Sequence, residues 1–271
     1  MFGFVIRLAV ISLSATALFS SANESAPRIW IFNGLPGDEE HHQFFEKNLA
    51  AIRKAFTNRF QIPAENISIL YGPKEAGYLN TASRENVLTE LENIVQHSQK
   101  PDASPVWIIF HGHANRIPGG ASLNLPGPDL SSKDIARALH KVSTESTLVI
   151  LATTAASSDF LRDLSGPGRI VIAANSPKDP VSEPDFPLAL SMALTSAELD
   201  ADKDNLVSVL ELFRACKQQI LSLYESQGYM VREHAQLDGN GDGKGTQRPA
   251  SEDGDPASKV TLPIPQLSKF E

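Results

Sequence analysis

The chain has 271 residues, of which 41% are hydrophobic and 21% are charged, and its formal net charge is −8. This length and composition suit one large globular core. The negative charge argues against nucleic acid and anionic membrane surfaces as partners. The single cysteine, Cys216, excludes an internal disulfide. Because Cys216 falls on or beside an apolar helical stripe, we expect a small core side chain there rather than a nucleophile.

Residues 1–22 have the features of a secretory signal peptide. Arg7 supplies a positive charge, an apolar stretch follows it, and Ser20, Ser21 and Ala22 are small residues suited to cleavage. The apolar stretch is too short to span a bilayer, and no later run reaches the ~20 apolar residues of a membrane helix. We therefore expect an exported protein, periplasmic or extracellular, with no membrane span in the mature chain.

Residues 27–236 are predicted to form an α/β domain. Five apolar runs have the length of strands, and their hydrophobicity is continuous rather than alternating, which is typical of strands buried on both faces. Helical patterns separate these runs, with starts at Asp38, at Ser83 and at Asp129 or Ser131. The sequence thus predicts a mostly parallel sheet flanked by helices, with right-handed crossovers. The five predicted strands are residues 28–32, 66–72, 106–110, 148–152 and 169–175.

The character of the sequence changes after Asn175. A proline-rich connection leads to two helical patterns, which predict a helix–loop–helix over residues 186–226. Before this point, residues 121–125 predict a short edge strand, but no strand pattern is evident after it. Residues 237–271 are rich in Asp, Gly, Pro and Ser and have little to bury, so we expect a tail or wrapping segment there rather than a domain.

The predicted third strand ends in two histidines, His111 and His113, separated by Gly112. In open α/β sheets, binding sites lie at the carboxyl ends of the strands. A histidine fixed there beside a glycine can act as a general base, and a purely structural role is the alternative. Two histidines in three residues are also compatible with a metal pair, but no carboxylate or thiol cluster nearby in the sequence completes the spacing of a zinc site.

These residues give the chain a resemblance to a known family. The strand that ends in Gly112 and His113, the Asn-Leu-Pro-Gly stretch at 124–127 and a fourth strand that runs into small residues resemble the caspase-like fold. Within that fold, the chain is most similar to the legumain and clostripain-like cysteine peptidases. The resemblance covers about residues 28–196 in the order of elements. It implies that His113 holds the position of the general base, with Ala114 where the family has glycine.

The same resemblance implies a nucleophilic cysteine in the turn after the fourth strand, and this turn has none. Ala155 holds that position or, with a shift of one residue, Thr154. A thiol ionises near neutral pH, whereas a hydroxyl must be deprotonated during attack by a well-aligned base. The alternative is a hydrolase in which Thr154 or Ser157 acts with His113. No acidic residue that would orient His113 is visible in the sequence.

Residues 200–211 fit the calcium loop of an EF-hand, with aspartate at positions 1, 3 and 5, serine at position 9 and glutamate at position 12. Asn205 replaces the usual glycine at position 6, and asparagine tolerates a positive φ better than most residues. Helical patterns flank the loop, and the alternative is an acidic helix N-terminus without a metal. The predicted Ca²⁺ ligands are Asp200, Asp202, Asp204, the Leu206 carbonyl, Ser208 through water and bidentate Glu211.

A second Asp-rich loop contains Asp238, Asn240 and Asp242, with a glycine at position 6 of a calcium loop. Position 12 would be Pro249, so no bidentate glutamate closes this loop. A flexible turn and a weak or shared calcium site are the two alternatives.

Together these patterns predict an exported calcium-binding protein with a caspase-like fold that is a non-catalytic relative of cysteine peptidases. The predicted partner is a peptide or protein at the strand edge that bears His111, His113 and Thr154. Glu233 and His234 could add ligands to the second acidic loop or lie near His113. The alternatives are the hydrolase described above and a docking module formed by the Asp-rich loops and the tail.

Overall fold

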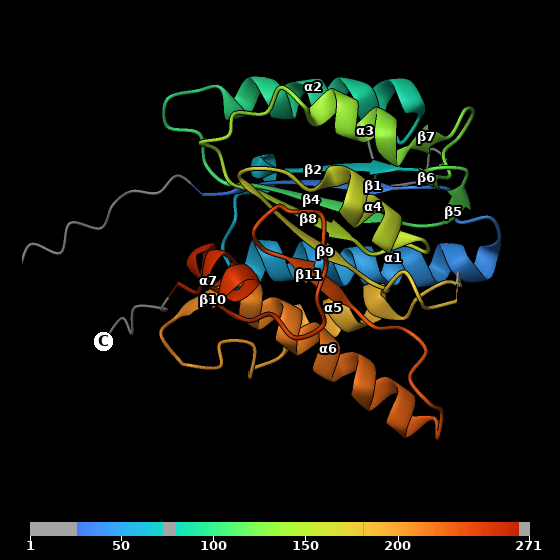
Figure 1. Cartoon of the computed structure of the whole chain (residues 1–271), viewed down its shortest axis with the longest axis vertical. Helices are drawn as coiled ribbons and strands as arrows, with labels where there is room; N and C mark the ends of the chain where they lie inside the picture. The colour runs from blue at the N-terminus through green and yellow to red at the C-terminus, as the bar shows by residue number, and fades with distance from the viewer. Residues whose placement is uncertain (1–25, 73–79, 181, 266–271) are drawn as a thin grey trace, which may run out of the picture.

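The structure is a computed structural model that describes residues 26–72, 80–180 and 182–265; the predicted signal peptide lies outside these residues. A seven-stranded sheet runs through the middle of the molecule, with helices packed on both faces (Figure 1). In spatial order its strands are β11 (Gln236–Asp238), β9 (Arg169–Ala173), β8 (Leu148–Ala152), β4 (Val106–His111), β1 (Arg28–Asn33), β2 (Ile67–Tyr71) and β3 (Asn80–Thr81).

Neighbouring strands in this sheet pair in parallel, except that β11 runs antiparallel to β9. The five predicted strands correspond to β1, β2, β4, β8 and β9. The predicted α/β fold, with a mostly parallel sheet flanked by helices, is therefore confirmed.

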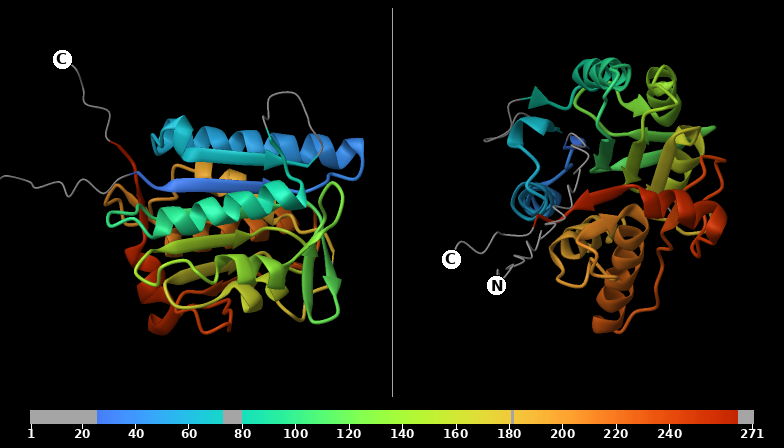
Figure 2. Two further views of the ribbon diagram at one scale, coloured as in Figure 1. Left: turned by 90° about the horizontal axis from the view of Figure 1, so that it is seen from above. Right: turned by 90° about the vertical axis from the view of Figure 1, so that its left-hand side faces the viewer.

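Each face of the sheet has its own apolar core and its own set of helices (Figure 2). Successive side chains of β4 alternate between the two cores: Trp107 and Ile109 enter one, and Ile108 and Phe110 enter the other. Because both faces are buried, the strands appear in the sequence as continuous apolar runs. The first core is covered by α1 (Glu39–Lys54), α5 (Phe186–Thr195) and α6 (Val209–Ser226), and the second by α2 (Arg84–Ser98), α3 (Ser132–Leu139) and α4 (Ser157–Leu164).

The helices begin where the sequence predicts. The side chains of Asp38, Ser83 and Ser131 each accept a backbone N–H from the first turn of α1, α2 and α3. Such caps satisfy donors that a helix leaves unpaired at its N-terminus. Two short helices complete this part of the chain, the π-helix η1 (Ala55–Arg59) directly after α1 and the 3₁₀-helix η2 (Ala64–Asn66) before β2.

A small antiparallel sheet lies after β4. It consists of β5 (Ala114–Ile117), β6 (Gly120–Leu123) and β7 (Leu130–Ser131). The strand predicted at 121–125 is β6, shifted by one to two residues at its ends. The prediction of an edge strand was wrong, because β6 lies between β5 and β7 and pairs with both.

Residues 237–265 do not form a free tail but wrap onto the domain, which is the second of the two expected arrangements. Leu237 and Leu262 have no exposed surface, because the segments that carry them pack onto the domain. The averaged composition of residues 237–271 is polar, and it conceals these isolated buried leucines. The elements formed are β11 at the sheet edge, α7 (Ser251–Lys259) against α6, and β12 (Thr261–Pro263) paired antiparallel with β10 (Leu206–Ser208).

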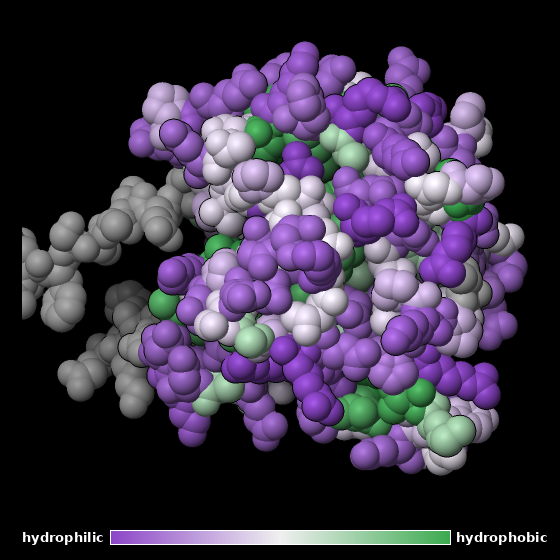
Figure 3. Space-filling model, in the orientation of Figure 1, coloured by the Kyte–Doolittle hydropathy of each residue, from purple (hydrophilic) through white to green (hydrophobic). Residues whose placement is uncertain are grey.

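The face drawn in Figure 3 is mostly hydrophilic, and the most extended of its hydrophobic areas lies at the lower right, near the C-terminal end of α6. Exposed large hydrophobic side chains near that end of α6 are Leu221, Tyr229 and Met230. Within the described part of the chain, no helix combines the length and apolarity needed to cross a membrane.

Candidate functional site

The carboxyl ends of β1, β4 and β8 lie side by side at one edge of the sheet. Asn33 pairs with His111, and Phe110 pairs with Ala152. The backbone N–H and the Oγ1 of Thr153 both donate to the Phe110 carbonyl, at 3.0 Å and 2.9 Å. The structure thus places the turn after β8 beside the end of β4, as expected for parallel neighbours.

Glycine fixes the turn that follows β4. Gly112 has a φ of +99°, and a Cβ there would lie 2.8 Å from the Gly34 nitrogen. Glycine reaches this φ without the steric cost that other residues meet. The Gly34 N–H donates to the His111 carbonyl at 2.9 Å, so the loop between β1 and α1 lies directly against this turn. The start of α1 therefore stands beside His113.

His111 is part of the core rather than of a surface. It has no exposed area, and its ring packs edge-on against Phe45 with centroids 5.0 Å apart. Neither ring nitrogen has a hydrogen-bond partner among the described residues. Burial lowers the pKa of His111 to about 3, so the ring is neutral at physiological pH. His111 therefore cannot contribute to the partner surface predicted at this edge, because a fully buried ring contacts no partner.

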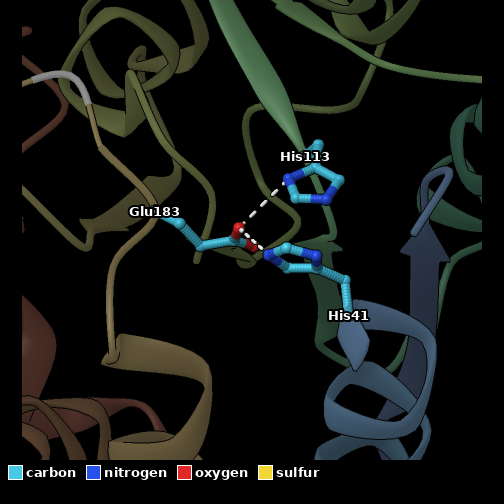
Figure 4. A group of neighbouring side chains, drawn as sticks. All are labelled: His41, His113 and Glu183. Atoms are coloured by element: carbon cyan, nitrogen blue, oxygen red, sulfur yellow. Dashed lines mark ion pairs between the residues drawn. The ribbon is translucent and has the colours of Figure 1, made fainter. Parts of the chain in front are cut away.

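His113 meets two residues from distant parts of the chain, and all three side chains point toward one another (Figure 4). His41 comes from the first turn of α1, and Glu183 from the connection between β9 and α5. The Glu183 Oε2 atom lies 3.2 Å from His113 Nδ1 and 3.2 Å from His41 Nε2. The two imidazole rings are 4.7 Å apart between centroids. About a third of each side chain is exposed, so ions from solvent can reach the cluster.

In each histidine, the ring nitrogen that faces away from Glu183 also has a polar partner. His41 Nδ1 lies 2.7 Å from Asp38 Oδ1, and His113 Nε2 lies 2.7 Å from the Pro36 carbonyl oxygen. The hydrogen bond with Glu183 raises the pKa of His113, and burial only partly opposes it. Glu183 is therefore the acidic residue next to His113 that the sequence did not reveal.

The predicted hydroxyl groups have other partners. Thr154 is almost fully buried, and its Oγ1 donates to the Ala155 carbonyl at 3.0 Å. Ser157 is fully buried in the first turn of α4, and its Oγ accepts the Asn175 N–H at 3.0 Å. Among the described residues, no hydrogen bond joins either hydroxyl to His113. Cys216 is fully buried, as expected, and burial raises the pKa of its thiol.

The first acidic loop, residues 200–211, joins α5 to α6. Asn205 has a φ of +69°, and its N–H donates to Asp200 Oδ2 at 3.0 Å. The Asp204 N–H donates to Asp202 Oδ1 at 3.3 Å. One carboxylate oxygen from each of the three aspartates lies within 4.8 Å of the others. The residues predicted at positions 1, 3 and 5 are therefore close enough to bind one ion.

Glu211 closes the loop from the first turn of α6. Its Oε1 accepts the Ala201 N–H at 2.9 Å, and its Oε2 accepts the Ser208 N–H at 2.8 Å. The Ser208 Oγ in turn accepts the Glu211 N–H, which completes a capping box. Leu206 and Ser208 belong to β10, whose pairing with β12 fixes the second half of the loop.

The first acidic loop carries an excess of negative charge. Asp200 Oδ1 is buried and has no hydrogen-bond partner among the described residues. The backbone hydrogen bond from Asp204 lowers the pKa of Asp202, but desolvation and the charges of Asp204, Glu211 and Asp200 together raise it. A buried, unpartnered carboxylate oxygen is unfavourable unless a cation compensates it.

The second acidic loop repeats part of this pattern. Asp238 Oδ2 accepts the Gly243 N–H at 2.7 Å, as Asp200 accepts that of Asn205. Asp253, in the first turn of α7, accepts the Gly239 N–H at 3.1 Å. An acidic side chain from a later helix therefore closes this loop, although position 12 is a proline. The predicted residues Asp238, Asn240 and Asp242 each accept a backbone N–H from within the loop.

Glu233 and His234 contact neither acidic loop through a hydrogen bond within the described residues. Glu233 Oε1 accepts the Asp185 N–H at 3.0 Å. His234 Nδ1 lies 2.7 Å from Asp179 Oδ1, and the His234 N–H donates to Asp179 Oδ2 at 2.8 Å. These contacts fix the connection between β9 and α5 at Asp179 and at Asp185, on either side of Glu183.

Comparisons with known proteins give a match in structure alone. No family model and no curated protein sequence matches the chain. Among solved structures, the chain is similar to one titled "structure of pro-sf-caspase-1", with a TM-score of 0.49 and 12% sequence identity. The match covers 85% of this chain and 94% of the other.

Sequence reasoning missed His41 and Glu183. A signal for His41 existed, because a helix that follows β1 must begin at the edge where β4 also ends, and His41 lies in its first turn. No comparable signal marks Glu183, which stands in an irregular proline-rich connection far from His113 in the chain.

Proposed function

We propose that the protein is an exported, calcium-binding relative of caspase-like cysteine peptidases that has lost peptidase activity. The calcium proposal rests on Asp200 Oδ1, which is a buried carboxylate oxygen without a hydrogen-bond partner among the described residues. It lies in a loop with the spacing of a calcium site. The proposed ligands are Asp200, Asp202, Asp204, the Leu206 carbonyl, Ser208 through water and Glu211.

A helix cap without a metal accounts for only part of this loop. The capping box explains the contacts between Ser208 and Glu211. It does not explain why Glu211 also reaches Ala201 at the start of the loop, or why three further carboxylates converge there. Ca²⁺ prefers six to eight oxygen ligands from carboxylates, carbonyls and water, and the loop provides such a set.

The absence of peptidase activity is supported by the turn after β8. Ala155 stands where the resemblance to cysteine peptidases implies the nucleophile. The neighbouring hydroxyls of Thr154 and Ser157 are buried and bonded to backbone groups. His113, in the position of the base, is engaged by Glu183 and Pro36. A nucleophile and base within hydrogen-bond reach of one another would be the minimum for such chemistry.

The calcium proposal is tested by thermal unfolding in millimolar Ca²⁺ and in chelator. We expect a higher melting temperature with Ca²⁺, since a ligand at 100 times its dissociation constant stabilises the folded state by about 2.7 kcal/mol. Glu211→Gln should abolish the difference, because it removes the bidentate carboxylate while glutamine can still complete the capping box.

The matched control is Glu198→Gln, an exposed acid shortly before the loop, which should keep the full calcium response. An identical melting temperature of the wild-type protein in both buffers, together with no heat of Ca²⁺ binding, would refute the proposal.

The loss of peptidase activity is tested with a peptide library. We expect no cleavage by the wild-type protein, because no free nucleophile faces His113 in the described residues. Cleavage that disappears in His113→Ala would instead establish the hydrolase alternative with Thr154 or Ser157.

A further inference from the structure

We infer that His41, His113 and Glu183 form a binding site for a divalent transition-metal ion of the Zn²⁺ class, separate from the acidic loops. One ligand atom from each of the three residues lies within 4.8 Å of the others. The side chains converge from α1, from the turn after β4 and from the connection before α5 (Figure 4).

The hydrogen bonds outside the cluster determine where the ring protons lie. The Pro36 carbonyl can only accept, so His113 donates to it from Nε2. The Asp38 carboxylate also accepts, so His41 donates to it from Nδ1. In the neutral rings, the inner nitrogens therefore carry lone pairs. Both of these nitrogens face the Glu183 carboxylate, which is itself an acceptor.

Three acceptors that converge on one point repel one another unless a metal ion or a proton lies between them. The outer contacts are also those typical of metal-binding histidines, which donate their second N–H to a carboxylate or a backbone carbonyl. That partner fixes the tautomer and aims the ring at the metal. Here both types of partner occur, the carboxylate of Asp38 and the carbonyl of Pro36.

The two distances from Glu183 fit a tetrahedral ion. Bonds of 2.0–2.1 Å to zinc place neighbouring ligand atoms about 3.3 Å apart in a tetrahedron. Glu183 Oε2 lies 3.2 Å from each of the two inner ring nitrogens. Imidazole nitrogen favours Zn²⁺ and its neighbours in the first transition row over Ca²⁺ or Mg²⁺, which prefer oxygen. Two histidines and one glutamate leave a fourth position for water.

Contacts on the side away from the proposed metal position each ligand, as outer partners do in metal sites. The His113 ring packs edge-on against Phe45 with centroids 5.2 Å apart. Glu183 is carried on the connection that Glu233 and His234 secure through Asp185 and Asp179. The three ligands therefore need little rearrangement to bind an ion.

A protonated histidine shared with Glu183 is the competing explanation, because a proton can also bridge an imidazole and a carboxylate. The two explanations differ in how they respond to a rise in pH. A rise in pH removes a bridging proton, whereas metal binding strengthens as protons leave the ligands.

The experiment is a titration of metal-free protein with Zn²⁺, and separately with Co²⁺, at pH 8. The titration is made on the wild-type protein in millimolar Ca²⁺, and the comparison with His41→Ala and Glu183→Gln separates the cluster from the acidic loops. We expect one equivalent to bind, with the intense visible absorption of tetrahedral Co²⁺. His41→Ala and Glu183→Gln should abolish that spectrum. Asp38→Asn, which retains a helix cap, should weaken Zn²⁺ binding by about 10-fold.

The matched control is His140→Ala, an exposed histidine after α3 that lies outside the cluster and should leave binding unchanged. Circular dichroism of each variant establishes that the fold is retained. Absence of Zn²⁺ binding in the wild-type protein, or equal binding in His41→Ala and Glu183→Gln, would overturn the site. Both outcomes are independent of whether the acidic loops bind Ca²⁺.

Discussion

Two histidines that stand two residues apart have opposite surroundings. The His111 ring is enclosed by the core and stays neutral, because burial lowers its pKa to about 3. The His113 ring projects from the other side of a glycine turn, and the hydrogen bond with Glu183 raises its pKa. The difference arises because β4 ends between these two residues. Residue 111 is still in β4, where both faces of the sheet are covered, whereas residue 113 lies beyond it.

We expect Glu233 to make the stability of the protein depend on pH. Burial, and to a lesser extent the charge of Asp185, raises its pKa to about 8. Between pH 4.5 and 8, the folded state therefore binds more protons than the unfolded state, so the free energy of unfolding falls as pH rises through this range. Glu233→Gln should remove this decline, which is on the order of a few kcal/mol. Urea unfolding at pH 5 and pH 8 measures it.

Glutamine is suited to this test because its side-chain oxygen can still accept the Asp185 N–H. Glu225→Gln, an exposed change on α6, is the control and should keep the wild-type slope. A Glu233→Gln protein that loses as much stability as wild type between the two pH values would contradict the prediction.

At the residue scale, the sequence reveals a site when its ligands are neighbours in the chain. Asp200, Asp202 and Asp204 follow a fixed spacing, and one carboxylate oxygen from each lies within 4.8 Å of the others. The cluster around His113 has no such spacing, because His41 and Glu183 are brought to it by the order of strands in the sheet. A pattern search along the chain cannot detect ligands of this kind.

At the element scale, the turn after β4 depends on Gly112. Gly112→Ala combines a φ of +99° with a Cβ placed 2.8 Å from the Gly34 nitrogen, so the two loops must separate. We expect a loss of more than about 2 kcal/mol, since the strained φ alone costs of order 1–3 kcal/mol. Urea denaturation measures this loss.

Gly127→Ala is the matched control for this substitution. Gly127 has a similar φ of +88°, but nothing lies within 4 Å of an added Cβ. It should therefore show the cost of the backbone angle alone. Equal losses in the two variants would mean that the close approach of Gly34 has no energetic importance.

The long buried strands were predictable because each contains a run of four or five apolar residues between turn signals. β10, β11 and β12 have three residues each, too few for any period to appear. Their position depends on pairing with strands distant in the chain. Tertiary contacts, not local pattern, create these elements.

At the scale of the whole molecule, the C-terminal segment is part of the domain. A truncation before Leu237 removes most of β11, all of α7 and all of β12, together with the fully buried Leu237 and Leu262. Loss of one buried leucine side chain costs 2–5 kcal/mol, and the total stability of a domain is about 5–15 kcal/mol. We therefore expect the truncated protein to be largely unfolded at 37 °C, as measured by near-UV circular dichroism.

This expectation alters the test of the docking alternative. A truncation that unfolds the domain cannot separate a docking role of residues 237–271 from a structural one. Substitutions of exposed charges, such as Lys244→Ala and Glu252→Ala, probe docking without removing buried side chains. A truncated protein with the native near-UV spectrum would contradict the structural role assigned to the segment.

The position of β11 determines the order in which the sheet can be completed. A chain is synthesised from its N-terminus, so β9 is available some sixty residues before its outer partner β11 exists. During that interval β9 presents an unpaired edge, and such edges readily pair with other chains. The pairing of β11 with β9 therefore ends the period in which this edge can aggregate. A chaperone that delays folding until the whole chain is available would protect this protein at that edge.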